Sequence, residues 1–204
     1  MEVLDENKIK KCLTDHGIIA FPTETVMGLG IYFDDEIAFE NLNRIKGRPS
    51  DKPYTLMLAN KQNIRDFAYL NEKDKLIIDA FMPGPITILL RSKPNLPKWV
   101  DLGTGIIGVR VPDYEESLKV LNAAGKPLLV PSANKSGENP ALNGLEVKNI
   151  FGDEVGYIIE GEAGKQKPST IVDLTKGKIN IIREGPITLE EINKVIGEWI
   201  WRLQ

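Results

Sequence analysis

The chain of 204 residues carries 26 lysines and arginines against 29 aspartates and glutamates, a formal net charge of −3, and 42% of its residues are hydrophobic. This length and composition predict one folded domain over residues 1–204 and exclude a disordered chain. The single cysteine and single histidine exclude an internal disulfide and a structural zinc site. The acidic balance excludes a surface that is basic throughout, so any anion must be bound at a local cluster of bases.

The N-terminal residues and the apolar runs bear on where the chain resides. Residues 1–6 form neither a basic nor an apolar leader, and no apolar run approaches the length of about 18 residues that a membrane span needs. We therefore expect a cytoplasmic protein that does not contact a membrane.

Hydrophobic periodicity predicts helices and strands in alternation. The first helix carries Leu4, Ile9, Cys12 and Leu13 on one face and ends near Gly17. Later helices are predicted at residues 35–45, 73–82, 115–124 and 189–203. Strands are predicted at residues 18–21, 54–58, 86–91, 106–111, 128–130, 157–160, 169–174 and 179–183.

These elements predict an α/β fold in which helices cover a sheet. The Val- and Ile-rich runs are typical of strands that are buried on both faces. A short connection joins residues 171–174 to residues 179–182, which is the pattern of an antiparallel hairpin. The sheet is therefore expected to be mixed rather than wholly parallel.

Two features near predicted elements favour structural interpretations. His16 follows the first helix, where its imidazole is expected to cap the last carbonyls, and no neighbouring residue completes a nucleophile–base pair. Gly103, Gly105 and Gly108 match the letters of the dinucleotide-binding G-x-G-x-x-G, but that motif must lead from a strand into a helix. Here the chain continues into a predicted strand, so the match does not predict a dinucleotide site.

Hydrogen-bonding side chains follow two of the predicted strands. Residues 21–30 contain two threonines and a glutamate, and residues 130–137 contain Ser132 and Asn134. Ligand sites on sheets form at such strand ends. Both segments are also explained as tight turns, because their residues are common in turns, and the two interpretations stay open.

The segment 46–53 gathers positive charge between a predicted helix and a predicted strand. Lys46, Arg48 and Lys52 are accompanied by one acid, Asp51, and by glycine and proline residues that restrict the backbone. Arginine binds phosphate oxygens as a fork and lysine adds a point charge, so the segment suits a polyphosphate. A solvated surface loop is the alternative.

Arg110 and Arg183 lie in otherwise apolar strands. A buried arginine is costly unless it is paired, so each needs a carboxylate or phosphate partner, which a substrate could supply. On this interpretation Arg110 and Arg48 face a ligand, and replacing either with alanine is expected to abolish activity and leave the fold intact.

Six segments together resemble one known family, the YrdC/Sua5 group of threonylcarbamoyl-adenylate synthases. They are Pro22-Thr23-Glu24-Thr25-x-x-Gly28-Leu29-Gly30, Lys46-x-Arg48 with Lys52-Pro53, Pro83-Gly84-Pro85, Val109-Arg110-x-Pro112, Ser132-Ala133-Asn134-x-Ser136-Gly137 and Ser169-Thr170-Ile171-Val172-Asp173. Their order and spacing are similar to the family pattern over roughly residues 10–185. The resemblance implies the short, single-domain form and an open, twisted mixed sheet with a concave ligand cleft.

The resemblance also implies an activity and a set of site residues. The expected enzyme condenses L-threonine, bicarbonate and ATP into threonylcarbamoyl-AMP and pyrophosphate, for the threonylcarbamoyladenosine modification of tRNA. The residues expected to contact threonine are Thr25, Arg110, Ser132 and Ser169. Those expected to contact ATP are Arg48, Lys52, the backbone near Ile106, Asn134, the backbone near Leu142, and Arg183. The group expected closest to the chemistry is Lys46, Arg48, Ser132 and Asn134.

Two positions depart from the family pattern, and no acidic metal motif is expected. The family usually has tyrosine at Met27 and often histidine at Met57, and the second position usually lies near the threonine. Threonine selectivity is therefore the implied property that these departures affect. Mg²⁺ is expected to accompany ATP on its phosphates and waters, without a protein metal site.

Two other functions fit parts of the same pattern. A non-catalytic RNA-binding or accessory protein would use the local cluster of bases, although the net charge and the aromatic content of 7% do not favour it. A carbamoyl-transfer enzyme that uses carbamoyl phosphate is the other alternative. For the synthase, the expected partners beyond its substrates are a downstream tRNA threonylcarbamoyl transferase and, weakly, tRNA.

Overall fold

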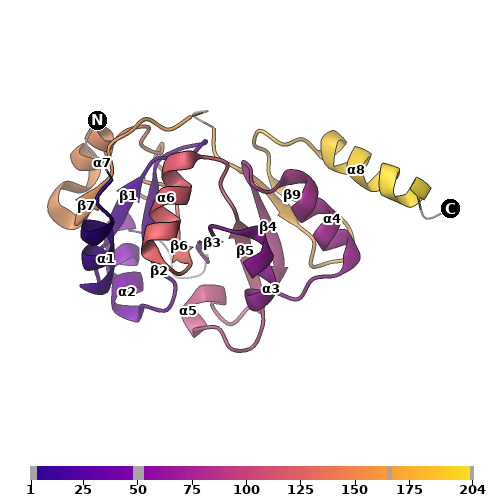
Figure 1. Ribbon diagram of the computed structural model, residues 1–204, viewed down its shortest axis with the longest axis horizontal. Helices are drawn as coiled ribbons and strands as arrows, with labels where there is room; N and C mark the ends of the chain where they lie inside the picture. Colours follow the sequence, from indigo (N-terminus) through magenta and orange to yellow (C-terminus); the bar gives the residue numbers. More distant parts are fainter. Residues whose placement is uncertain (1–3, 48–52, 165–166, 203–204) are drawn as a thin grey trace.

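The computed structural model describes residues 4–47, 53–164 and 167–202, with side chains as far as residue 197. Within these residues nine strands form one mixed sheet in the order β7-β1-β2-β6-β3-β5-β4-β8-β9 (Figure 1). The strands are β1 (Ile19–Phe21), β2 (Gly28–Tyr32), β3 (Thr55–Met57), β4 (Ile86–Arg91), β5 (Ile106–Arg110), β6 (Leu128–Leu129), β7 (Tyr157–Ile158), β8 (Thr170–Asp173) and β9 (Asn180–Arg183). The predicted α/β class is confirmed.

The pairing of the strands confirms the mixed sheet. β1 with β7, β3 with β5, and β4 with β8 are parallel, whereas the other neighbouring pairs are antiparallel. The predicted hairpin is the antiparallel pair β8–β9. Parallel β4 and β8 place Thr87 beside Ile171, so residues far apart in sequence meet at one end of the sheet.

Helices cover the sheet on both of its faces. They are α1 (Glu6–Thr14), α2 (Glu36–Lys46), α3 (Ile64–Phe67), α4 (Glu72–Phe81), α5 (Lys98–Asp101), α6 (Glu115–Ala124), α7 (Gly144–Phe151) and α8 (Leu189–Arg202), with 3₁₀ turns η1 (Lys61–Asn63) and η2 (Gly152–Glu154). In Figure 1, α1, α2, α6 and α7 lie around β1, β2 and β7, whereas α3, α4 and α8 lie at the other end of the sheet, by β4 and β9. None of the described helices is long and apolar enough to cross a membrane.

Two apolar clusters form the core, and strand alternation separates them. Ile19 and Phe21 point into the cluster that also holds Ile9 and Leu13 of α1, whereas Ala20 points into the larger cluster. Successive side chains of a strand face opposite sides of its sheet, so a fully buried β1 has core on both faces. This confirms the prediction of strands buried on both faces.

β2 was not predicted as a strand, because its segment was interpreted as part of a turn. Its glycines are explained by close packing rather than by a bend. A Cβ on Gly28 would lie 2.7 Å from a methyl of Val130, and one on Gly30 would lie 2.9 Å from the ring of Phe21. The strand needs glycine because neighbouring side chains fill that space.

The prediction for His16 is wrong in its detail. His16 has a φ of 60°, and its Nδ1 lies 2.8 Å from Oδ2 of Asp35, the residue that caps the start of α2. The imidazole therefore joins two helices instead of capping the last carbonyls of α1. The structural interpretation of the three glycines is supported, because Gly108 lies inside β5 rather than at the start of a helix.

Candidate functional site

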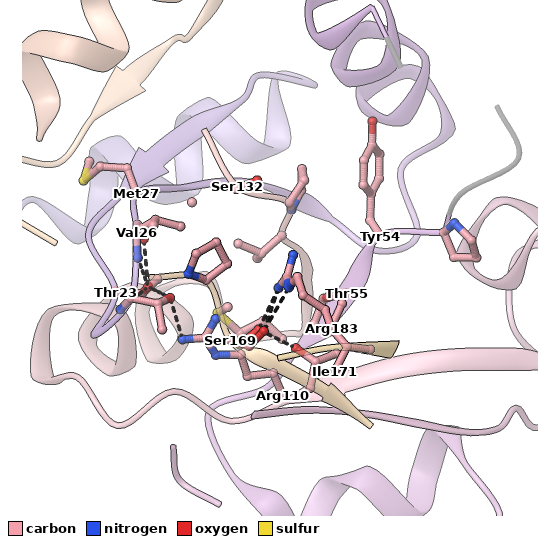
Figure 2. Close-up of a pocket in the computed structure, with 18 residues that line it drawn as sticks. Thr23, Val26, Met27, Tyr54, Thr55, Arg110, Ser132, Ser169, Ile171 and Arg183 are labelled. Atoms are coloured by element: carbon pink, nitrogen blue, oxygen red, sulfur yellow. Dashed lines mark hydrogen bonds between the residues drawn. The ribbon is translucent and has the colours of Figure 1, made fainter. Parts of the chain in front are cut away.

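A cavity of about 140 Å³ opens where the strand ends and loops of the sheet meet (Figure 2). Its walls come from the loop after β1, from β3 to β5, from the chain after β6, and from β8 and β9. The lining residues are Thr23, Thr25, Val26, Met27, Gly28, Pro53, Tyr54, Thr55, Met57, Thr87, Arg110, Val130, Pro131, Ser132, Pro168, Ser169, Ile171 and Arg183. Among the described residues that line it, both charged side chains are arginines.

The segment after β1 is a turn that also forms part of the cavity wall. The Thr23 hydroxyl donates to the Val26 carbonyl at 2.7 Å and accepts the Thr25 N–H at 3.1 Å, which is the hydrogen bonding of a threonine turn. The Thr23 and Thr25 hydroxyls are 2.8 Å apart. The turn interpretation is therefore confirmed, and the same turn places Thr25 in the cavity wall.

Arg110, the last residue of β5, is buried beside this turn. Its Nη2 donates to the Thr25 hydroxyl at 3.0 Å and lies 2.8 Å from Oε2 of Glu24. Arg110 is 6% exposed and Glu24 7%. The partner that the sequence left open is thus a carboxylate of this chain.

The Arg110–Glu24 pair is held by charge more than by aligned hydrogen bonds. The contact between Arg110 Nη2 and Glu24 Oε2 is short but is not aligned as a hydrogen bond, and the buried Arg110 Nε and Glu24 Oε2 have no hydrogen-bond partner among the described residues. The other Glu24 oxygen accepts the Asp113 N–H at 3.2 Å. A buried guanidinium with a free donor is suited to receive an anionic ligand.

Ser169 and Arg183 form the opposite wall. Arg183 donates from Nε and Nη2 to the Ser169 carbonyl, at 3.0 and 2.9 Å, and the Ser169 hydroxyl lies 3.0 Å from that of Thr87. Burial, followed by repulsion from the Arg110 charge, lowers the pKa of Arg183 from its ordinary value. Two guanidinium groups that repel each other across one cavity favour an anion between them.

The buried side chain of Lys46, which is 2% exposed, anchors the loop after β6 by hydrogen bonds. The Lys46 ammonium donates to the carbonyls of Ser132 and Asn134, each at 2.6 Å. The Ser132 hydroxyl donates to the Asn134 side-chain oxygen at 2.6 Å, so the two side chains meet as the sequence suggested. Ser132 lines the cavity, whereas Asn134 does not, and the Asn134 side-chain amide donates to the Glu138 carbonyl at 2.9 Å.

The structure places five of the eleven predicted site residues in the cavity wall. Thr25, Arg110, Ser132, Ser169 and Arg183 line the cavity. Figure 2 shows Arg110, Arg183 and Ser169 close together, whereas the ring of Tyr54 points away from them. Arg48 and Lys52 lie outside the described residues.

Ile106 and Leu142 do not line the cavity. The Leu142 N–H donates to a Glu146 carboxylate oxygen at 2.7 Å, and the Ile106 N–H donates to the Thr104 hydroxyl at 3.2 Å. Both backbone donors are therefore engaged within the chain.

Glu24 and Thr87 belong to the site although no role was predicted for either. Glu24 lies within a motif that was recognised, but its ion pair with Arg110 joins residues 86 positions apart, which local pattern does not reveal. Thr87 is a lone hydroxyl between Ile86 and Ile88 of β4, and this polar interruption of an apolar strand is the signal that could have identified it.

The two positions that depart from the family pattern are both in the cavity wall. Met27 and Met57 are buried, at 0% and 1% exposed. A thioether is at most a weak hydrogen-bond acceptor, so neither side chain donates to a ligand. Within the described residues, no three His, Cys, Asp or Glu side chains are grouped so that they could hold a metal ion.

Comparison with known sequences identifies similar proteins over most of the chain. A family model described as Sua5_yciO_yrdC, telomere recombination, matches residues 11–185. The threonylcarbamoyl-AMP synthase of Pyrococcus abyssi is 36% identical over 183 residues, which are 89% of this chain and 54% of that protein. A Methanocaldococcus jannaschii protein that bears the same name provisionally is 35% identical over 185 residues, 90% of this chain and 87% of that one. The chain thus spans about half the length of the P. abyssi relative.

Solved structures give the same relationship. The crystal structure of P. abyssi Sua5 complexed with L-threonine superposes with a TM-score of 0.89 and 34% identity, covering 97% of this chain and 59% of that one. The crystal structure of Escherichia coli YciO superposes with a TM-score of 0.84 and 25% identity, covering 92% of this chain and 94% of that one. The second protein has the length of the short form that the sequence predicted.

Proposed function

Because the chain belongs to the Sua5/YciO/YrdC family, we propose that it is a threonylcarbamoyl-AMP synthase. In the proposed reaction the threonine amine attacks the carbon of bicarbonate, and loss of water leaves a carbamate. A carbamate oxygen then attacks the α-phosphorus of ATP, the bond from that phosphorus to the pyrophosphate oxygen breaks, and threonylcarbamoyl-AMP and pyrophosphate are formed.

One observation carries this proposal beyond family membership: two guanidinium groups face one cavity, and the four residues expected to contact threonine all line it. The reaction brings an amino-acid carboxylate and a triphosphate together, so its site must neutralise several negative charges. Arg110 and Arg183 supply that charge in a protein whose net charge is −3. A cavity of this kind favours anionic substrates by its local field.

Arg110 and the neighbouring hydroxyls are proposed to hold threonine. The buried Arg110 Nε lacks a partner among the described residues, and a substrate carboxylate would provide one. The hydroxyls of Thr25, Ser132 and Ser169 are hydrogen-bonding groups for the remaining polar atoms of the amino acid. Glu24 pairs with Arg110 and holds it in place, which makes Glu24 a positioning residue.

Arg183 and the loop fastened by Lys46 are proposed to face ATP. The exposed end of Arg183 suits a phosphate, because the bonds to the Ser169 carbonyl already fix its Nε and Nη2. Lys46 holds the loop that carries Ser132 and Asn134, the residues proposed to lie closest to the α-phosphorus. Arg48 and Lys52 would add charge to the same phosphates, and Mg²⁺ would arrive bound to ATP.

This chemistry needs alignment more than acid–base catalysis. A carbamate is already an anionic nucleophile, so its attack on phosphorus requires two anions to be held in line while charge on the leaving pyrophosphate is neutralised. Each well-placed donor contributes about 3–4 kcal/mol to lowering such a barrier. Arginine, lysine, hydroxyl and amide groups perform these tasks without an imidazole.

The test is pyrophosphate release from Mg-ATP with threonine and bicarbonate varied separately. We expect release only when both co-substrates are present, and threonylcarbamoyl-AMP as the product detected by mass. Release that ignores the removal of either co-substrate would overturn the synthase proposal, and release driven by carbamoyl phosphate in their place would favour the carbamoyl-transfer alternative. The product would then be consumed by an enzyme that transfers the threonylcarbamoyl group to tRNA.

A further inference from the structure

A second hollow lies beside α3 and α4, away from the cavity of the candidate site. It consists of two adjoining cavities, of about 440 and 350 Å³, which share Tyr69 and Leu70 in their walls. We call the two together the α3–α4 groove. The residues that line it are Lys61, Gln62, Arg65, Ala68, Tyr69, Leu70, Asn71, Asp74, Lys75, Ile78, Asp79, Leu90, Arg91, Lys93, Leu174, Thr175 and Gly177.

The α3–α4 groove is basic although the chain as a whole is acidic. Its charged lining residues are Lys61, Arg65, Asp74, Lys75, Asp79, Arg91 and Lys93, five bases against two acids. One acid is occupied elsewhere, because Asp74 accepts the Asn71 N–H in the capping box that begins α4. The other, Asp79, is paired with Lys61 at 2.8 Å.

Three of these bases make no ion pair within the described residues: Arg65, Arg91 and Lys93. Arg65 and Arg91 are exposed, and Lys93 is half-buried. Positive charge that is concentrated in a groove and not compensated by acids attracts a polyanion.

An exposed aromatic ring lies where the two cavities meet. Tyr69 is 57% exposed, and its backbone is fixed because its N–H donates to the Arg91 carbonyl at 3.0 Å. The Lys93 N–H donates to the Phe67 carbonyl at 2.8 Å, so two backbone hydrogen bonds join residues 67–69 to residues 91–93. The ring is therefore presented to solvent on a rigid base, with cations on both sides of it.

We propose that the α3–α4 groove binds single-stranded RNA. Phosphates would lie against Arg65, Arg91 and Lys93, and one base would stack on Tyr69, since a basic channel with an aromatic platform is how single strands are bound. An acidic peptide is less well matched, because the backbone groups beside Tyr69 already bond each other and leave no strand edge for a peptide to join.

The α3–α4 groove is separate from the candidate site. In β4, Thr87 lines the cavity and Leu90 lines the groove, a separation of about 10 Å along the strand, and the groove's charged Arg91 is about 13 Å from Thr87. RNA binding is measured without ATP or threonine, so it does not depend on the proposed synthase activity, and either proposal can fail alone.

The test is fluorescence anisotropy of the full chain with a labelled 12-nucleotide single-stranded RNA at low and moderate salt. We expect binding that weakens as salt rises, because released counterions dominate contacts with phosphates. Arg65→Glu combined with Lys93→Glu should weaken binding tenfold or more. Tyr69→Ala should weaken it about fivefold or more with little change in salt dependence, while Tyr69→Phe should keep it, because stacking needs only the ring.

Matched controls separate this surface from general charge effects. Lys8→Glu combined with Lys10→Glu makes the same four-unit change of charge on α1, at the opposite end of the molecule (Figure 1), and should leave binding unchanged. The proposal is overturned by the absence of binding at low salt, by equal affinity of Tyr69→Ala and wild type, or by loss of binding in the α1 double variant as large as in the groove double variant. Equal competition by poly-glutamate or tripolyphosphate would likewise overturn it in favour of a ligand recognised by charge alone. Circular dichroism of each variant identifies any that does not fold. If the groove double variant does not fold, Arg65→Gln with Lys93→Gln replaces it, because this pair removes the two positive charges without adding negative ones.

Discussion

The cavity and the α3–α4 groove both concentrate positive charge, but they hold it differently. In the cavity, Arg110 is bonded to Thr25 and paired with buried Glu24, and Arg183 is fixed by the Ser169 carbonyl. In the groove, Arg65 and Arg91 are exposed and make no ion pair among the described residues. Both regions can bind anions, yet only the first holds its donors in one arrangement before a ligand arrives.

Because they hold their charges differently, the two regions are suited to different tasks. Preorganised donors stabilise one charge distribution at little reorganisation cost, which is what catalysis requires. Exposed, hydrated side chains interact weakly one at a time and are screened by salt, which suits a ligand that is bound along its length without a unique pose.

Removing Arg110 should damage both activity and folding. Arg110→Ala is expected to lower kcat/KM for pyrophosphate release at least 100-fold, by analogy with the loss of a single preorganised donor. It should also lower the free energy of unfolding by about 3 kcal/mol, because Glu24 would be left buried without its partner. The sequence predicted that Arg110→Ala would leave the fold intact because the arginine would face only a ligand. Arg110 is instead 6% exposed, so we expect the substitution to affect folding as well. Steady-state kinetics and urea unfolding provide the measurements.

A double variant distinguishes the two effects of Arg110. Glu24→Gln with Arg110→Met removes both charges and should recover much of the stability while activity stays lost. If the single variant unfolds at the same urea concentration as wild type, Glu24 is solvated, and the cavity is less preorganised than its geometry indicates.

Removing Arg183 should affect mainly ATP binding. Arg183 is exposed, although the guanidinium edge that bonds Ser169 is part-buried, and its partner is a neutral carbonyl. Arg183→Ala should therefore change the free energy of unfolding by less than about 1 kcal/mol. We expect the KM for ATP to rise about tenfold while the KM for threonine changes little, and Arg183→Lys should lie between wild type and Arg183→Ala because it keeps charge without the fork. A rise in the KM for threonine alone would reassign Arg183 to the amino-acid side of the cavity.

Sequence pattern predicted the regular elements well where periodicity was long. The bounds of β4 and α6 agree with the prediction, because β4 is an almost continuously buried apolar run and the buried residues of α6 recur at helical spacing. α3 and α5 were missed since four residues are too short to show a period, and the eight-residue α7 was missed as well. β2 was missed because its glycines, which tight packing requires, are also typical of turns.

The site was predictable only in part, for a related reason. Thr25 and Ser132 lie in contiguous polar segments next to strands, so local sequence pointed to those segments, whereas Ser169 was proposed through the resemblance to the family. The ion pair of Glu24 with Arg110 and the contact of Thr87 with Ser169 depend on which strands are neighbours in the sheet. The α3–α4 groove joins η1, α3, α4 and the end of β4, and its bases therefore do not form a run in the sequence.

The buried Met57 should limit how well the cavity recognises the threonine hydroxyl. We expect threonine to be preferred over valine by less than about 100-fold in kcat/KM, since an apolar wall discriminates poorly between isosteres that differ by a hydroxyl. Met57→Leu should leave this ratio unchanged, because neither side chain donates a hydrogen bond. A preference of 10⁴-fold or more, the level reached when buried polar groups bind a hydroxyl, would mean that Thr23 or Thr25 performs that recognition instead.

Reversing charge in the α3–α4 groove should have the smallest effect on pyrophosphate release. At 0.15 M salt the Debye length is about 8 Å, shorter than the separation of about 13 Å between Thr87 and Arg91 along β4. Arg65→Glu with Lys93→Glu should therefore change kcat and both KM values by less than about twofold. At 0.01 M salt, where the Debye length is about 30 Å, the same variant should raise the KM for ATP modestly. A loss of more than fivefold at 0.15 M salt would show that the two regions act as one site, and the distinction between preorganised and exposed cations would then no longer separate catalysis from binding.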